Sequence, residues 1–179
     1  HIRTPEPAAG LAYTFCKTTR NQPVIIREST TMKLKIGDPA PMFTATATDG
    51  SPIKLSDYFG TKLILYFYPM DDTPGCTKQA CSLRDHSAEI RDKGAAILGV
   101  STQDVKSHQD FTEKYNINFP LIADTDAAVA QAYGAIGSGS SLTGLAKSLF
   151  GVANRITFII DESGHIAHII DTPNCANHG

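Results

Sequence analysis

Apolar residues along this chain form short, nearly continuous runs that alternate with segments of helical spacing, and the alternation predicts strands separated by helices. Residues 63–68 and 95–100 are such runs, which is the pattern of strands covered on both faces. A polar segment with sparse apolar residues follows each run, at 76–93 and at 104–115, and Gly94 stands where the first helix would end. We therefore expect strand, helix, strand and helix in this order.

The remaining pattern predicts an α/β fold. A Thr-rich alternation before Asp49-Gly50 predicts a short hairpin, and two apolar runs joined by a turn that ends in Gly164 predict a second one. The other expected elements, in chain order, are the hairpin strand at 43–48, a strand at 119–123, a helix at 126–133, a Gly- and Ser-rich loop at 136–150 with a short helix around 142–149, and the closing strands at 156–160 and 165–170. This order predicts a central mixed β-sheet flanked by α-helices.

Domain organisation follows from where the pattern begins. A chain of 179 residues can bury one substantial core, so one domain is expected. Residues 1–31 are rich in Pro and Thr and show no clear period, whereas Met32 opens the patterned region. We therefore interpret residues 1–31 as an upstream extension or an added expression segment, Met32 as a native start, and residues 32–179 as the domain.

Charge and apolar content exclude several classes of partner. The formal net charge is −2 and the 16 Lys and Arg residues form no dense cluster, so neither nucleic acid nor an anionic membrane is expected as a main partner. The longest apolar stretch, residues 63–70, is far shorter than the roughly 20 residues that a membrane helix needs. These features predict a soluble protein.

Cysteine usage indicates the redox compartment. Cys16, Cys76, Cys81 and Cys175 are too few and too unevenly spaced for a disulfide-stabilised secreted scaffold. The first residues also lack the apolar core of a signal peptide. We expect a reducing compartment, which favours the cytoplasm, with an organelle as the alternative.

One cysteine lies just inside a predicted helix start. Thr73 and Pro74 read as the N-cap and the first helical residue, because a Thr hydroxyl can accept a free backbone N–H and Pro lacks only an N–H that has no helical partner. Cys76 then falls in the first turn, where the positive end of the helix dipole favours the nucleophilic thiolate. The alternative is an ordinary cap followed by a small buried hydrophobic residue.

A second cysteine follows five positions later. Five residues of α-helix turn the side chain by roughly 140° and advance it by about 7.5 Å, so Cys76 and Cys81 cannot form a disulfide while the helix is intact. Three interpretations stay open: a redox pair that requires unwinding, a Cys81 that only packs, and a metal site formed with His86. The spacing argues against a metal, since zinc sites use a second clustered pair and Cys175 and His178 are remote.

The stretch that carries both cysteines resembles a known active site. Residues 68–81, Tyr-Pro-Met-Asp-Asp-Thr-Pro-Gly-Cys-Thr-Lys-Gln-Ala-Cys, are similar to that of the peroxiredoxin Q group, also called the bacterioferritin comigratory proteins. The core Pro-x-x-x-Thr-x-x-Cys is typical of peroxiredoxins in general, and the second cysteine marks this group. The resemblance extends over roughly residues 32–171, including the opening at 37–43 and the strand at 154–161.

The resemblance implies a thioredoxin-like fold and a set of site residues. It makes Cys76 the peroxidatic cysteine and Cys81 the resolving cysteine, which together form the redox disulfide, and it adds Pro69, Thr73 and Arg155 to the catalytic site. An Arg that opens a strand is usually a solvated edge residue, so only the resemblance places Arg155 beside Cys76. There, its cation would stabilise the thiolate and bind the peroxide oxygens. Pro69 would shield the sulfur from water.

The implied activity is that of a monomeric thiol peroxidase without metal, flavin or haem. Its substrates would be hydrogen peroxide and organic hydroperoxides, and thioredoxin or a similar dithiol protein would reduce the disulfide. Two alternatives are a thiol–disulfide oxidoreductase, which would carry Cys-x-x-Cys at the helix start, and a redox-sensing binding module, in which disulfide formation would be too slow for peroxide removal.

Two departures from the family pattern concern the surface and the end of the chain. Met70 stands where relatives often carry Lys, and the chain stops at residues 173–179, where the family normally continues into a C-terminal helix, so either the chain is truncated or that helix is absent. No histidine is placed as a base beside Cys76, and Cys16 and Cys175 are expected to have no catalytic role. The histidines expected to be surface or structural residues are His86, His108, His165, His168 and His178.

Overall fold

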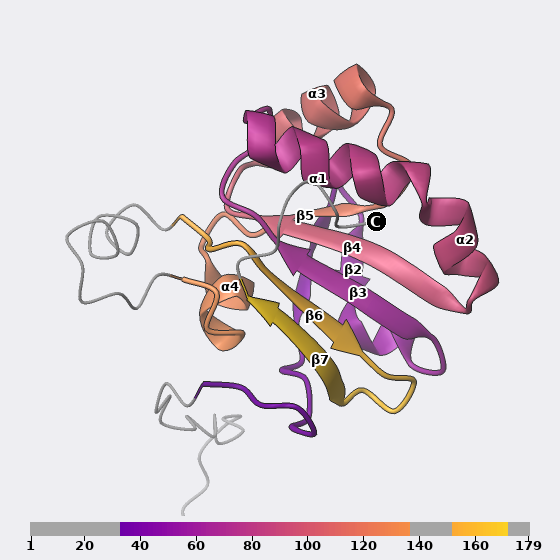
Figure 1. Cartoon of the computed structure of the whole chain (residues 1–179). Helices are drawn as coiled ribbons and strands as arrows, with labels where there is room; N and C mark the ends of the chain where they lie inside the picture. The colour runs from indigo at the N-terminus through magenta and orange to yellow at the C-terminus, as the bar shows by residue number, and fades with distance from the viewer. Residues whose placement is uncertain (1–32, 137–151, 172–179) are drawn as a thin grey trace, which may run out of the picture. The chain divides into compact units, whose positions relative to one another are not determined.

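A mixed sheet of seven strands forms the centre of the computed structural model, which describes residues 33–136 and 152–171 (Figure 1). The strands lie in the order β2-β1-β5-β4-β3-β6-β7. Their bounds are β1 Thr44–Ala47, β2 Pro52–Lys54, β3 Lys62–Phe67, β4 Ala95–Ser101, β5 Leu121–Ala123, β6 Ile156–Ile160 and β7 Ile166–Asp171. The helices are α1 Pro74–Asp85, α2 Ser87–Asp92, α3 Val105–Tyr115 and α4 Ala128–Ala132, with a short 3₁₀ turn, η1, at Leu55–Tyr58.

The sheet combines parallel and antiparallel pairs. β3, β4 and β5 run parallel to one another, as expected for strands joined by helical crossovers. β6 pairs antiparallel with β3 and with β7, and β1 pairs antiparallel with β2 and with β5. This arrangement confirms the predicted mixed sheet and its thioredoxin-like fold.

Successive side chains of β3 enter two separate cores, one on each face of the sheet. Leu65 and Phe67 pack on one face with residues of α4. Tyr66 points to the other face, where α1 and α3 cover it. A strand buried on both faces needs apolar side chains at every position, which explains the continuous apolar run.

The predicted helix over 76–93 is wrong in one respect, because the chain forms two helices there. α1 ends at Asp85 and α2 begins at Ser87, with His86 between them at φ −95° and ψ 4°. The backbone N–H of His86 donates to the Ser82 carbonyl at 3.2 Å, and its ring Nδ1 lies 2.9 Å from the same oxygen. Gly94 ends the second helix with φ 71°, as predicted.

The other elements agree with the predictions to within a few residues at their ends. Both hairpins form, and α3 and α4 occupy the predicted helical segments. Most of the Gly- and Ser-rich loop with its short helix, Cys16, Cys175 and His178 lie outside the described residues. Within residues 33–136 and 152–171, no helix combines the length and apolar character that crossing a membrane requires.

Candidate active site

Residues 68–73, here called the active-site loop, connect the end of β3 to the start of α1. The loop begins at the sheet, where the backbone N–H of Tyr68 donates to the Val100 carbonyl at 3.1 Å. Pro69 follows and is partly buried. Asp72 has φ 55°, a left-handed conformation that turns the chain into the helix.

Thr73 holds the predicted N-cap position, but its side chain does not cap the helix. Its backbone is extended, with φ −88° and ψ 146°, and its carbonyl accepts from the N–H of Thr77 at 2.8 Å. The hydroxyl instead donates to the carbonyl of Met70 at 3.2 Å. The expected cap is therefore wrong in its hydrogen bond, because the turn at Asp72 brings a loop carbonyl within reach of the hydroxyl.

Cys76 is the third residue of α1, and its thiol faces the sheet. Its side chain is only 2% exposed and packs with Tyr66, Ala80 and Leu83. The guanidinium Nη2 of Arg155 donates to its Sγ at 3.2 Å. A charged donor at this distance can form a stronger hydrogen bond to an anionic sulfur or oxygen than a neutral donor can.

Arg155 reaches the sulfur because of the strand register. β6 runs antiparallel to β3 and Ile156 pairs with Phe67, so Arg155 lies where β3 ends and the active-site loop begins. The preceding residue is also fixed, since the N–H of Asn154 donates to the Ala135 carbonyl at 2.6 Å. The structure thus brings together two residues that are 79 positions apart in the sequence.

Gln79 is a site residue that the sequence reasoning missed. Its side chain is fully buried, at 0% exposure, and its Oε1 accepts from Nη1 of Arg155. The guanidinium fork is therefore held by the Gln79 amide on one nitrogen and by the sulfur on the other. An amide does not neutralise the cation as a carboxylate would, so the positive charge stays available to the thiolate. The spacing of three residues from Cys76 on one helix face was the available signal.

Cys81 lies on the same helix and is partly buried, and both thiols are free. The helix is regular between the two cysteines, so its geometry turns their side chains roughly 140° apart. Arg84, one turn beyond Cys81, donates to the Tyr115 carbonyl and so connects α1 to α3. The structure therefore shows a helix in which the two sulfurs cannot bond without backbone movement.

Tyr66 lies beneath the site as a neutral side chain. Burial raises the pKa of its hydroxyl well above the usual range, and the negative charges of Asp71 and Cys76 raise it further. Tyr66 therefore stays protonated at neutral pH and supplies no base. Among the residues that the structure describes, no three His, Cys, Asp or Glu side chains are grouped so that they could hold a metal ion.

Comparisons with known proteins identify close likenesses. The model of the AhpC/TSA family matches residues 36–169. The peroxiredoxin Bcp of Escherichia coli K12 is 40% identical over 145 residues, which cover 81% of this chain and 90% of that protein. The crystal structure of peroxidoxin BcpB from Mycobacterium tuberculosis has a TM-score of 0.70 and 31% identity, covering 81% of this chain and 91% of that one.

A third similar structure is that of a protein described for peroxide reduction. The bacterioferritin comigratory protein of Xanthomonas campestris, described for its alkyl peroxide reduction activity, has a TM-score of 0.68 and 30% identity. The match covers 76% of this chain and 84% of that one.

Replacing Arg155 tests what its contact with the sulfur does. Arg155→Met removes the cation and keeps an apolar stem, so the reaction of Cys76 with hydrogen peroxide should slow by the order of 10²-fold, as for loss of one preorganised donor. Timed mass spectrometry of Cys76 oxidation measures the rate. Arg91→Met, at an exposed position on α2, is the matched control. An unchanged rate in Arg155→Met would make the residue an ordinary strand-edge cation.

Proposed function

The chain belongs to the AhpC/TSA family and, within it, to the peroxiredoxins of the Bcp type, which are thiol peroxidases, and on this premise we propose that Cys76 is the thiol that reduces the peroxide. The observation that carries the proposal is the Arg155 guanidinium 3.2 Å from the Cys76 sulfur. Cys81 is then the resolving thiol, and Pro69 and Thr73 form the wall of the site on the active-site loop.

The first step oxidises Cys76. Its thiolate attacks one oxygen of the peroxide, so that an S–O bond forms as the O–O bond breaks. The sulfur loses two electrons and becomes a sulfenic acid, and the other oxygen takes a proton and leaves as water or an alcohol. Arg155 supports this step, because its donors can hydrogen-bond the peroxide oxygens as well as the sulfur.

The second step links the two cysteines. Cys81 attacks the sulfenic sulfur, an S–S bond forms, and the hydroxyl leaves as water. Since a disulfide needs Cα atoms closer than about 7 Å, α1 must unwind between the two cysteines before this bond can form. In the third step an external dithiol is oxidised to its disulfide, and Cys76 and Cys81 return to thiols.

The substrates we propose are hydrogen peroxide and alkyl hydroperoxides. The alkyl peroxide activity named for the Xanthomonas relative supports the second class. Met70 adds to this support, because its side chain is 45% exposed on the active-site loop and offers an apolar surface near the site. We further propose that the chain acts as a monomer and that thioredoxin or a similar dithiol protein is its reductant.

Cys76→Ser should abolish peroxidase turnover, because a Ser hydroxyl is not ionised at neutral pH and cannot replace the thiolate as nucleophile. Hydrogen peroxide consumption with a thioredoxin system present measures the loss, and Cys175→Ser serves as the matched control. Substantial peroxide consumption by Cys76→Ser would contradict the assignment of this thiol.

Cys81→Ser should still consume one equivalent of peroxide and then stop. No intramolecular thiol remains to trap the sulfenic acid, so Cys76 should stay as the sulfenic acid or be oxidised further to the sulfinic acid. Mass spectrometry of the intact variant distinguishes these products. A disulfide that joins Cys76 to another cysteine of the same chain would show that Cys81 is not the resolving residue.

A further inference from the structure

The active-site loop is fastened to α3 by two consecutive aspartates, and the peroxidase chemistry uses neither of them. Asp71 is buried, and its carboxylate accepts from the Tyr68 hydroxyl and the Ser107 hydroxyl, each at 2.7 Å. Its Oδ2 also lies 2.7 Å from Nδ1 of His108. Its backbone N–H donates to the Gln103 side chain. One loop residue is thus held by four groups.

Both ring nitrogens of His108 have a polar partner, and its side chain is 0% exposed. Its Nε2 lies 3.0 Å from the Ile122 carbonyl, which can only accept, so Nε2 carries a proton. Its Nδ1 faces the carboxylate of Asp71 at 2.7 Å. Burial raises the pKa of Asp71, but its hydrogen bonds to His108, Ser107 and Tyr68 and the attraction of His108 lower it further, so the net shift is downward. The two residues therefore form a buried, hydrogen-bonded pair.

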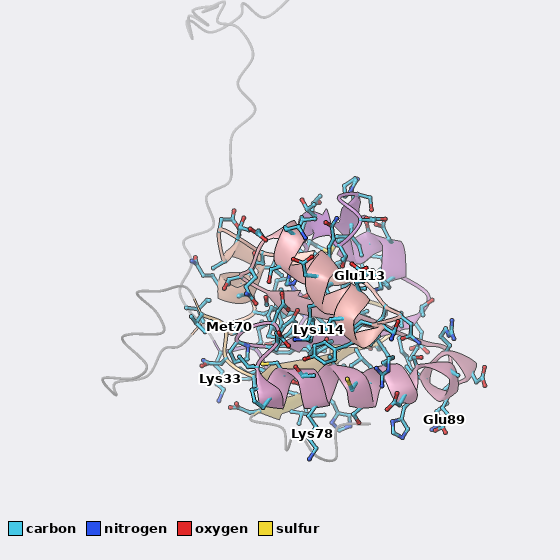
Figure 2. All side chains as sticks on the ribbon, turned by 90° about the horizontal axis from the view of Figure 1, so that it is seen from above. Lys33, Met70, Lys78, Glu89, Glu113 and Lys114 are labelled. Atoms are coloured by element: carbon cyan, nitrogen blue, oxygen red, sulfur yellow. The ribbon has the colours of Figure 1, made fainter. Side chains whose placement is uncertain are left out.

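Asp72 fastens the same loop from the solvent side. Its carboxylate accepts from Nζ of Lys114 at 2.6 Å and from the Tyr115 hydroxyl. Figure 2 looks down on the two helices and shows Lys114 between α3 and α1, whereas Lys78 points away from α3. Because Asp72 has a left-handed backbone, these contacts also hold an unfavourable conformation.

The contacts of Asp71 and Asp72 hold the loop immediately before α1, so they can control the position of the start of that helix. α1 begins at Pro74, two residues after Asp72, and Cys76 lies in its first turn. Arg155, the partner of the sulfur, comes from β6. The sulfur therefore meets the guanidinium only while the loop keeps the start of α1 in place against the sheet.

We propose that Asp71, Asp72 and His108, here called the clamp, are positioning residues that hold the chain in its peroxide-reactive conformation and oppose the unwinding that the disulfide requires. This inference rests on the proposed roles of Cys76 and Cys81. The hydrogen bonds of the clamp form while α1 is folded, and they are weakened when the active-site loop moves. They therefore bias the equilibrium between the closed and the unwound helix toward the closed form.

This role predicts opposite effects on two consecutive rates. Weakening the clamp lowers the population in which Arg155 contacts Cys76, so peroxide oxidises Cys76 more slowly. The same change raises the population of unwound helix, so the Cys76–Cys81 disulfide forms faster from the sulfenic acid. A residue that only contributes to general stability would not separate the two rates in this way.

Two substitutions of His108 distinguish a positioning role of this residue from a contribution to core packing alone. The amide nitrogen of Asn can take the place of Nδ1, and that of Gln the place of Nε2. His108→Asn therefore keeps the bond to Asp71, whereas His108→Gln keeps only the bond to Ile122. We expect His108→Gln to slow Cys76 oxidation about tenfold and to speed disulfide formation by a similar factor, with His108→Asn remaining within about 1.5-fold of the wild type.

Quenched-flow mass spectrometry follows both rates, since the chain contains no tryptophan for fluorescence. Hydrogen peroxide is the probe, and an alkylating quench distinguishes thiol, sulfenic acid and disulfide. Lys106→Gln, which removes an exposed ion pair with Asp110 on the same helix, is one control. Val129→Ala, in the core on the other face of the sheet, lowers stability without touching the loop.

The outcomes are distinguishable. Opposite shifts in His108→Gln that are absent from His108→Asn and from both controls support the clamp. Equal behaviour of the two His108 variants, or rates that fall together as in Val129→Ala, would overturn it and make His108 a packing residue. A wild type that forms no Cys76–Cys81 disulfide would overturn the proposed function itself.

If the His108 variants do not fold, a surface variant tests the positioning role of the clamp instead. Replacing Lys114 by Gln and Tyr115 by Phe together removes both side-chain partners of Asp72 and changes only exposed or partly exposed positions. We expect the same opposite shifts at about threefold, because exposed pairs contribute less than buried ones. Unchanged rates in this double variant would overturn the clamp.

Discussion

The chemistry proposed for this protein is constrained by the placement of Cys76 and Cys81 on one helix. α1 holds Cys76 against Arg155, as the proposed first step requires, and the same helix keeps Cys81 turned away from it. The two steps therefore need two conformations of the same residues. The strands are the part that does not change between these conformations. β3 leads into the active-site loop, and the Arg155 cation lies at the start of β6.

In its folded conformation α1 is held mainly at its start, and it buries few apolar side chains of its own. The residues that α1 buries are Cys76, Gln79, Ala80 and Leu83, and Leu83 is the largest apolar side chain among them. The Thr77 hydroxyl and the Gln79 amide nitrogen are buried without a protein hydrogen bond. A helix with these properties opens at low free energy, so contacts from the loop to α3 can control its population.

The local sequence pattern was sufficient to predict the fold and part of the site. Strand β3 was predictable because a strand buried on both faces is apolar throughout, and Cys76 because a helix start has its own signals in Thr73 and Pro74. The contact of Arg155 was not predictable from the residues around it, since it depends on the register between β3 and β6, and only the family resemblance indicated it. The role of His108 was not predictable for the same reason, since this buried side chain is paired with Asp71, 37 positions away. The break at His86 has no Gly or Pro to mark it.

If α1 unwinds when the Cys76–Cys81 disulfide forms, amide hydrogen exchange on the two redox forms detects it directly. We expect the amides of residues 77–84 to lose protection in the disulfide form, while those of β4 keep theirs as an internal reference. We also expect a lower free energy of unfolding for the disulfide form, since so short a loop restricts the unfolded chain little while the native helix is lost. Equal protection of residues 77–84 in both forms would contradict the unwinding, and with it the role of Cys81.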